Sequence, residues 1–312
     1  MVSITRILCP VDFSACSRRA LDYAVAMGRW YGARVTALHV FPNLPVIDGV
    51  PMYRGQPLVL KDQDPATLRA DFEAFVRTAS PGAPVETEIL EATDVQKAIV
   101  NYAEFIRADL IVLGTHGRSG VERLIVGSVA ERVGRHAGCP VMLVPPRAAS
   151  KPQHLPVPFS RIVCAVDFAP TSRRAFDMAL ELAEEADAHL TLLHAIEVPP
   201  ELQVPMTIGE VDVAAARAAA EAEALQHLRE LLPGDARTYC KVHTDVREGR
   251  PDRLIVEAAA DRQADLIVMG VANHNALDRL LFGDSTHAVL RSARCPVLTV
   301  GTTTAQPQAE VA

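Results

Sequence analysis

The chain has 312 residues, of which 49% are apolar and 22% are charged, and its formal net charge is -7 at pH 7. This length is enough for two domains, and the composition is that of an ordinary globular protein. The negative charge argues against nucleic acids and anionic membranes as partners, since both need a basic surface. The sequence shows no apolar run of the roughly 18 to 20 residues that span a bilayer and no secretory signal pattern, so we expect a cytoplasmic protein.

Short apolar runs alternate with amphipathic segments through the first half of the chain. Between the first two runs the spacing predicts a helix, with Leu21 and Val25 on its buried face. The Pro-rich segment that starts at Phe41, FPNLPVIDGVPMYRGQP, is expected to be a surface loop, with a lid over a site as the alternative. The predicted strands are residues 4–11, 34–40, 85–90, 110–113 and 141–144, and further predicted helices cover residues 65–79, 95–107 and 128–137.

The second half of the chain repeats the first. RILCPVDFSACSRRALDYA, from Arg6, aligns without gaps with RIVCAVDFAPTSRRAFDMA, from Arg161, and ADLIVLG, from Ala108, matches ADLIVMG, from Ala264. Such collinearity predicts the duplication of a whole domain. Alternating strands and helices with short connections favour an α/β fold, an open and doubly wound parallel sheet with helices on both faces in each copy. The expected boundaries are residues 1–146 and 159–302 for the two domains, 147–158 for a Pro-rich linker and 303–312 for a tail.

Several candidate binding residues follow the predicted strands, where ligands bind in sheets of this kind. Asp12 ends the first strand, and its carboxylate either accepts hydrogen bonds from a ribose or an amine or stabilises the start of the next helix. Val40 ends the second strand, where its backbone can pair with a base edge. Gly114 opens the loop GTHGRSGVERLIVGS, which closes at Gly127 and Ser128. Because amides at a helix start bind anions, this loop is either a phosphate cradle or a flexible connection.

Known catalytic patterns are absent from the sequence. It contains no P-loop, no GxGxxG fingerprint, no GxSxG elbow and no HExxH, so we predict neither catalytic residues nor a metal site. The six cysteines form no CxxC pair and are expected to be buried structural residues. Cys16 lies near a predicted helix start, where the pKa of a thiol falls. His116 and Arg118 either contact phosphates or are solvated loop residues.

The same stretches resemble the universal stress protein family. Gly114-x2-Gly117-x9-Gly127-Ser128 matches the nucleotide-binding signature of that family, G-2x-G-9x-G-[S/T]. The opening VDFSACSRRAL, the LHV that ends at Val40, DLIVLG and CPV are also similar to the family. The resemblance covers nearly the whole chain, in a tandem two-domain form.

The resemblance implies two five-stranded parallel sheets of the adenine-nucleotide alpha-hydrolase-like kind, with ATP, alone or with Mg²⁺, bound across strand ends. By position, Asp12 and Val40 would hold the adenosine, and the glycines and Ser128 of the loop the phosphates. It also implies that the last strands, CPVMLV and CPVLTV, pair antiparallel. The two copies would then pair within one chain, and two chains would form a homodimer.

The second copy departs from this signature. Asp167 and Gly270 match, but Ala195 stands in place of Val40, Asn273 in place of the second glycine, and Asp284 in place of Ser128. A carboxylate at that place repels phosphate unless a divalent cation bridges them or Ser285 supplies the lost donor. We therefore expect tight ATP binding in the first copy and weak or absent ATP binding in the second.

The leading functional hypothesis is an ATP-binding universal stress protein with a nucleotide-dependent regulatory role and an unknown protein partner. The alternatives are a slow ATPase or autophosphorylating protein and a nucleotide-independent scaffold. No group that would activate water is evident in the sequence, so we expect weak hydrolysis at most.

Overall fold

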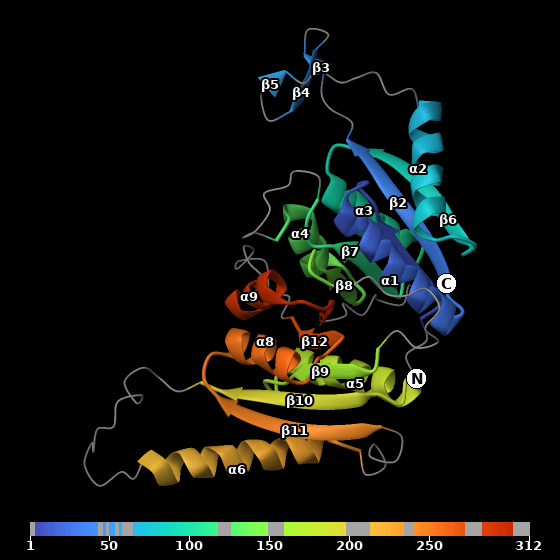
Figure 1. Cartoon of the computed structure of the whole chain (residues 1–312). Helices are drawn as coiled ribbons and strands as arrows, with labels where there is room; N and C mark the ends of the chain where they lie inside the picture. Colours follow the sequence, from blue (N-terminus) through green and yellow to red (C-terminus); the bar gives the residue numbers. More distant parts are fainter. Residues whose placement is uncertain are drawn as a thin grey trace, which may run out of the picture. The chain divides into compact units, whose positions relative to one another are not determined.

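The computed structural model describes residues 4–42, 46–47, 50–53, 56–57, 65–117, 126–148, 159–197, 213–233, 240–271 and 283–301. The chain divides into two compact units, an N-terminal unit (Ser3–Pro156) and a C-terminal unit (Val157–Ala312). Figure 1 shows that each unit has its own strands and helices. Most of the predicted linker and all of the predicted tail lie outside the described residues.

The five main strands of the N-terminal unit are parallel. They lie in the order β6-β2-β1-β7-β8, so the chain starts in the middle, winds to one side and then returns past β1 to the other. The reversal beside β1 is where doubly wound sheets bind ligands. The strands are β1 (Arg6–Pro10), β2 (Arg34–Pro42), β6 (Val85–Ala92), β7 (Leu110–Gly114) and β8 (Val141–Val144).

Helices cover both faces of this sheet. α1 (Ala15–Tyr31) packs on β1 and β7 and contacts α2 (Pro65–Ala79), whereas α3 (Val95–Phe105) packs on β2 beside α4 (Ser128–His136). Because both faces are covered, β7 and β8 are almost continuous buried apolar runs rather than alternating ones.

The C-terminal unit has the same topology. Its parallel strands lie in the order β11-β10-β9-β12-β13, with α5 on β9 and β12, α6 along β10 and β11, and α8 beside α9 (Figure 1). The predicted α/β class and the doubly wound parallel sheets are therefore confirmed. The elements are β9 (Arg161–Ala165), α5 (Pro170–Glu185), β10 (His189–Ile196), α6 (Val213–Leu231), β11 (Lys241–Glu248), α8 (Pro251–Asp261), β12 (Leu266–Gly270), α9 (Asp284–Ser292) and β13 (Val297–Val300).

One segment differs from the loop that the sequence led us to expect. After β2, the strands β3 (Val46–Ile47), β4 (Val50–Tyr53) and β5 (Gln56–Pro57) form a small antiparallel sheet. Val and Ile favour extended backbone, and the sequence places Asp-Gly between β3 and β4, which is a strong hairpin signal. Because proline is uncommon inside strands, the Pro-rich composition of the segment favoured a loop.

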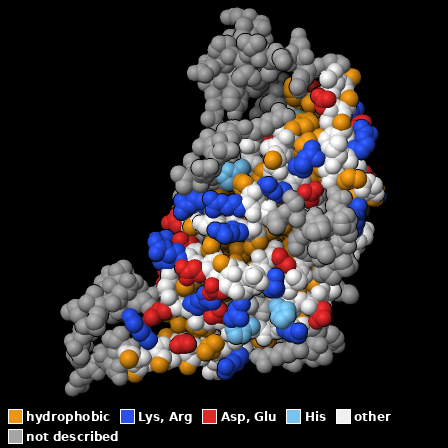
Figure 2. All heavy atoms as spheres, viewed as in Figure 1, with side chains coloured by type: hydrophobic (Ala, Val, Ile, Leu, Met, Phe, Trp, Pro, Cys, Tyr) orange, Lys and Arg blue, Asp and Glu red, His pale blue; other side chains and the backbone are white. Residues whose placement is uncertain are grey.

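Lys and Arg side chains lie among Asp and Glu side chains over both units on the face drawn in Figure 2. The described side chains on this face thus form no broad basic surface, in keeping with the net charge of -7. Of the helices in the described ranges, none combines the length and the apolar character needed to cross a membrane.

Candidate functional site

A histidine ties the ends of the first two strands together in each unit. Nδ1 of His39, on β2, lies 2.7 Å from the carbonyl oxygen of Val11, and since a carbonyl only accepts, the ring donates this hydrogen bond. Nδ1 of His194, on β10, makes the same bond to Val166 at 2.7 Å. Both strand-end histidines therefore have a structural role.

The same strand end turns the backbone of Val40 toward the space beyond β1. The Leu38 carbonyl accepts the Val11 N–H at 2.8 Å, just past the last residue of β1. Residues two apart on a strand direct their backbone polar groups to the same side. Val40 therefore directs its N–H and carbonyl to a side where β1 no longer continues, as the pairing with a ligand would require.

Asp12 stands in a strained turn between β1 and α1. Its Oδ1 accepts the Ser14 N–H at 3.0 Å, and Phe13 has a φ of 64°, which is rare for a bulky residue. The Phe13 ring packs edge-on against His39, with ring centroids 4.8 Å apart. One oxygen of Asp12 thus supports the start of α1, which is the structural alternative, while the other oxygen, Oδ2, lies beside Gly117.

The C-terminal unit repeats this turn. Oδ1 of Asp167 accepts the Ala169 N–H at 3.0 Å, and Phe168 has a φ of 63° and stacks near His194 at 4.6 Å between centroids. Both units therefore share one arrangement at the end of their first strand, an Asp-Phe turn beside a histidine hydrogen bond.

The three glycines of the signature are needed for different reasons. A Cβ on Gly114 would lie 2.8 Å from Sγ of Cys16 on α1, whereas a Cβ on Gly117 would meet Oδ2 of Asp12 at 2.6 Å and no other non-neighbouring atom below 3.8 Å. The N–H of Gly127 donates to the Thr115 carbonyl at 2.7 Å, which closes the loop. The lack of a side chain at Gly114 thus serves the packing of α1 on β7.

The start of α4 presents backbone N–H groups. Its N-cap Gly127 has no side chain to accept them, and Ser128 at the first helical position is exposed. Such a helix start favours an anion.

All six residues predicted for the site line one cavity. It has a volume of about 190 Å³ and lies at the ends of β1, β2 and β7 beside the start of α4. The sequence reasoning missed Ser17 as a wall residue, although SRR occurs at the same place in both copies. The predicted residues in the wall are Asp12, Val40, Gly114, Gly117, Gly127 and Ser128.

Two further side chains near the cavity have shifted pKa values. Burial lowers the pKa of His116, whose Nδ1 lies 2.9 Å from Oγ1 of Thr115, and His116 lines the cavity. Burial raises the pKa of the Cys16 thiol, so the lower pKa expected at a helix start is wrong. Arg118 lies outside the described residues.

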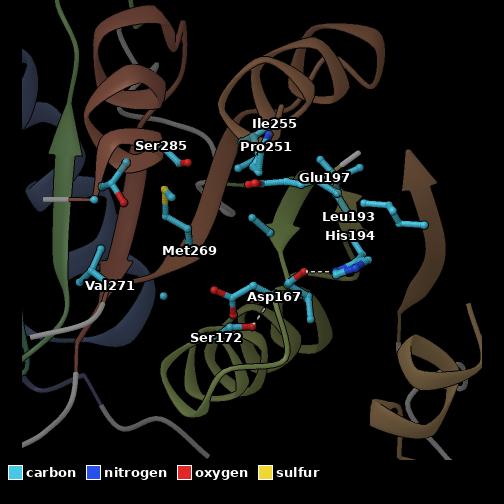
Figure 3. A pocket seen from close by; sticks show the side chains of 17 residues that line it. Asp167, Ser172, Leu193, His194, Glu197, Pro251, Ile255, Met269, Val271 and Ser285 are labelled. Carbon is cyan, nitrogen blue, oxygen red and sulfur yellow. Dashed lines mark hydrogen bonds between the residues drawn. The ribbon is translucent and has the colours of Figure 1, made fainter. Parts of the chain in front are cut away.

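The C-terminal unit has a larger cavity at the matching strand ends (Figure 3). Its volume is about 540 Å³, and its wall includes Asp167, Ala195, Gly270, Gly283 and Ser285. The exposed Asp284 does not belong to that wall. Asn273 lies outside the described residues.

A doubly wound α/β fold with a cavity at its strand ends, built twice in one chain, defines a tandem protein with two candidate ligand sites. The family model "Universal stress protein family" matches residues 3–145 and 158–301, and the chain therefore belongs to the universal stress protein family.

Relatives cover one or both units. A universal stress protein of Mycolicibacterium smegmatis is 26% identical over 303 residues, which are 94% of this chain and 96% of that protein. One of Mycobacterium tuberculosis is 31% identical over 218 residues, 69% of this chain and 68% of that protein. The crystal structure of a universal stress protein from Archaeoglobus fulgidus has a TM-score of 0.59 at 17% identity, covering 96% of this chain and 97% of that one, which supports the fold alone.

Proposed function

We propose that the chain is an ATP-binding universal stress protein whose N-terminal unit holds the nucleotide and thereby regulates an unidentified protein partner. One observation carries this proposal: residues far apart in sequence, chosen by the family signature, line one cavity at the strand ends. A signature kept for packing alone would not need Asp12, Val40 and Ser128 in the same wall.

The residues present fit an adenine nucleotide. The carboxylate of Asp12 can accept hydrogen bonds from ribose hydroxyls. The backbone of Val40 faces the open side of β2, where it can pair with the base. With about 190 Å³ the cavity is smaller than the roughly 300 to 1,000 Å³ of most small-molecule sites. We therefore propose that it takes the base and the sugar, and that the phosphates lie over the exposed rim at Gly117 and Ser128.

The charges of the wall favour backbone recognition of the phosphates. The described wall residues include no Lys or Arg, so the amides at the start of α4 are the main anion donors within the described wall. The described residues include no group of three or more His, Cys, Asp or Glu side chains placed to hold a metal. We propose that Mg²⁺, when it accompanies ATP, is held by the phosphates.

Binding with slow or no turnover suits the wall better than efficient hydrolysis. Asp12 is the one carboxylate among its described residues, and Oδ1 already accepts the Ser14 N–H. A slow ATPase stays the alternative, and phosphate release measured over hours from the purified protein separates the two. We further propose a homodimer, as the family resemblance implies, which sedimentation of the full chain tests.

Gly117→Val tests the site with little risk to the fold. The added Cβ meets the end of the Asp12 side chain, which can move, and the methyl groups then fill the rim. We expect ATP affinity measured by calorimetry to fall about tenfold or more, since bulk at the rim blocks the phosphates. Gly138→Val is the matched control, because a Cβ there meets no atom within 4 Å, and it should bind ATP normally. Unchanged affinity in a folded Gly117→Val protein would refute the proposal.

A further inference from the structure

The cavity of the C-terminal unit has two carboxylates in its wall and no compensating Lys or Arg among its described residues. Figure 3 shows these carboxylates, Asp167 and Glu197, on opposite sides of the cavity. Oδ1 of Asp167 accepts one backbone N–H, whereas Glu197 has neither a hydrogen bond nor an ion pair within the described ranges. Two carboxylates facing one cavity favour a cation over an anion.

Two arginines on the neighbouring elements are already paired. Arg247 on β11 contacts Asp245 and Asp261, each at 3.0 Å, and Arg250 at the start of α8 contacts Asp252 at 3.1 Å. These arginines therefore do not neutralise the cavity. At the start of α9, Asp284 opposes the partial positive charge of the helix end.

Asp167 has a counterpart in Asp12, but the second rim carboxylate belongs to this unit alone. The third residue after the strand-end histidine is Glu197 here and Pro42 in the N-terminal unit. At the first residue after that histidine, Ala195 replaces Val40, which removes bulk from the wall. The two units thus differ in both the charge and the size of the space at the same strand ends.

The floor of the cavity is apolar. Its buried side chains come from β10, α8 and β12 and the residue after β12, and the volume of about 540 Å³ lies within the range of small-molecule sites. An apolar body with a ring or two therefore fits below the charged rim. The floor residues are Leu193, Ile255, Met269 and Val271.

We propose that this cavity binds a small organic cation, a primary amine with an apolar ring-bearing body whose ammonium group contacts Glu197 and Asp167. The site discriminates against phosphate-bearing ligands, because Glu197 adds to the negative charge of Asp167 a second carboxylate that the N-terminal unit lacks. This proposal is independent of ATP binding in the N-terminal unit.

A matched pair of ligands tests the charge requirement. Tryptamine and tryptophol share the indole body, but the first ends in an ammonium group and the second in a hydroxyl. By calorimetry on the full chain at pH 7, we expect tryptamine to bind about tenfold more tightly or better, because a charged donor to a carboxylate outweighs a neutral one. This preference should shrink as salt is added. Equal affinity for both ligands, or binding of neither tryptamine nor phenethylamine, would overturn the proposal.

Substitutions of wall residues test whether the amine binds in this cavity. Glu197→Gln should remove most of the preference for the amine, and Ala195→Val should weaken both ligands by refilling the wall. Glu248→Gln is the control, since this carboxylate pairs with Arg217 at 3.2 Å outside the wall, and it should leave the preference unchanged. Circular dichroism checks that each variant is folded. An amine preference that survives both Glu197→Gln and Asp167→Asn, or displacement of tryptamine by ATP in the Gly117→Val protein, contradicts the assignment.

Discussion

The cavity of the N-terminal unit measures about 190 Å³ and that of the C-terminal unit about 540 Å³, although the same strand order and the same Asp-Phe turn surround both. The smaller cavity has the complete glycine signature, whereas the larger one has Asp284 where the signature requires Ser or Thr. A phosphate signature and a ligand-sized space are therefore separate properties. Side chains at the strand ends, such as Val40 and Ala195, change the space without changing the fold.

The largest expected difference between the units is in ATP affinity. We expect one tight ATP per chain, with the C-terminal cavity weaker by about 2 kcal/mol, or thirtyfold, from one lost donor and one added charge. Because Asp284 is exposed, solvent screens its charge, and its repulsion of the phosphates contributes only a small part of this difference. Equilibrium dialysis counts the nucleotides per chain. Two equivalent sites would remove this distinction between the units.

A double variant sharpens the same comparison. Asn273→Gly with Asp284→Ser should raise ATP affinity in the C-terminal unit, although Ala195 and Glu197 remain. Ser285 lines the cavity and supplies one hydroxyl already. A dialysis count that stays at one would indicate that the rim charge, and not the loop, decides against nucleotides.

The packing at the end of the fourth strand of each unit should differ in strength. A Cβ on Gly270 would lie 2.5 to 2.8 Å from three backbone atoms of Thr171 and Ser172, whereas on Gly114 it meets Sγ of Cys16 at 2.8 Å and one backbone carbon of Cys16 at 3.0 Å. A backbone cannot move aside as a thiol can, so Gly270→Ala should cost more, within about 1–3 kcal/mol of unfolding free energy. Urea unfolding measures both variants. Gly283→Ala, whose Cβ meets no atom of the described residues within 4 Å, should be near neutral, and an equal loss there would contradict the packing argument.

A smaller difference is expected for the two serines at the helix starts. Ser128→Ala should weaken ATP binding by about 0.5–1.5 kcal/mol through the loss of one hydrogen bond, whereas Ser285→Ala should leave the tight site unchanged. Calorimetric titration of both variants distinguishes the serine of the nucleotide site from the serine at the start of α9. A larger effect from Ser285 would place the nucleotide in the other unit.

The smallest effect concerns His116, which the second copy replaces with Ala272. Burial lowers its pKa below the usual 6.5, so the folded state holds fewer protons than the unfolded chain as pH falls past that value. The stability from this group is therefore present above pH 6.5 and is lost as pH falls through the lowered pKa. Titration by NMR should show the low value in the free protein and a rise when ATP is added. No change on adding ATP would mean that the phosphates lie elsewhere.

Much of the fold follows from local patterns, and several features of the sites do not. The helix at residues 65–79 and the strands after Asp109 and Asp265 have strong periodicity or apolar runs, which the sequence displays directly. The packing role of Gly114 depends on where α1 crosses β7, and the importance of Glu197 depends on which side chains share a wall. Both are contacts between distant residues, so no local pattern reports them.

The positive φ angles of Phe13 and Phe168 have a consequence for how far the two units can differ. Phe13 and Phe168 have the same unusual backbone conformation, and each ring packs against the strand-end histidine of its own unit. Because this turn fixes the end of the first strand in each unit, the side chains around it can differ in charge and size while the backbone stays the same. A new ligand preference at one strand end therefore does not require a new fold.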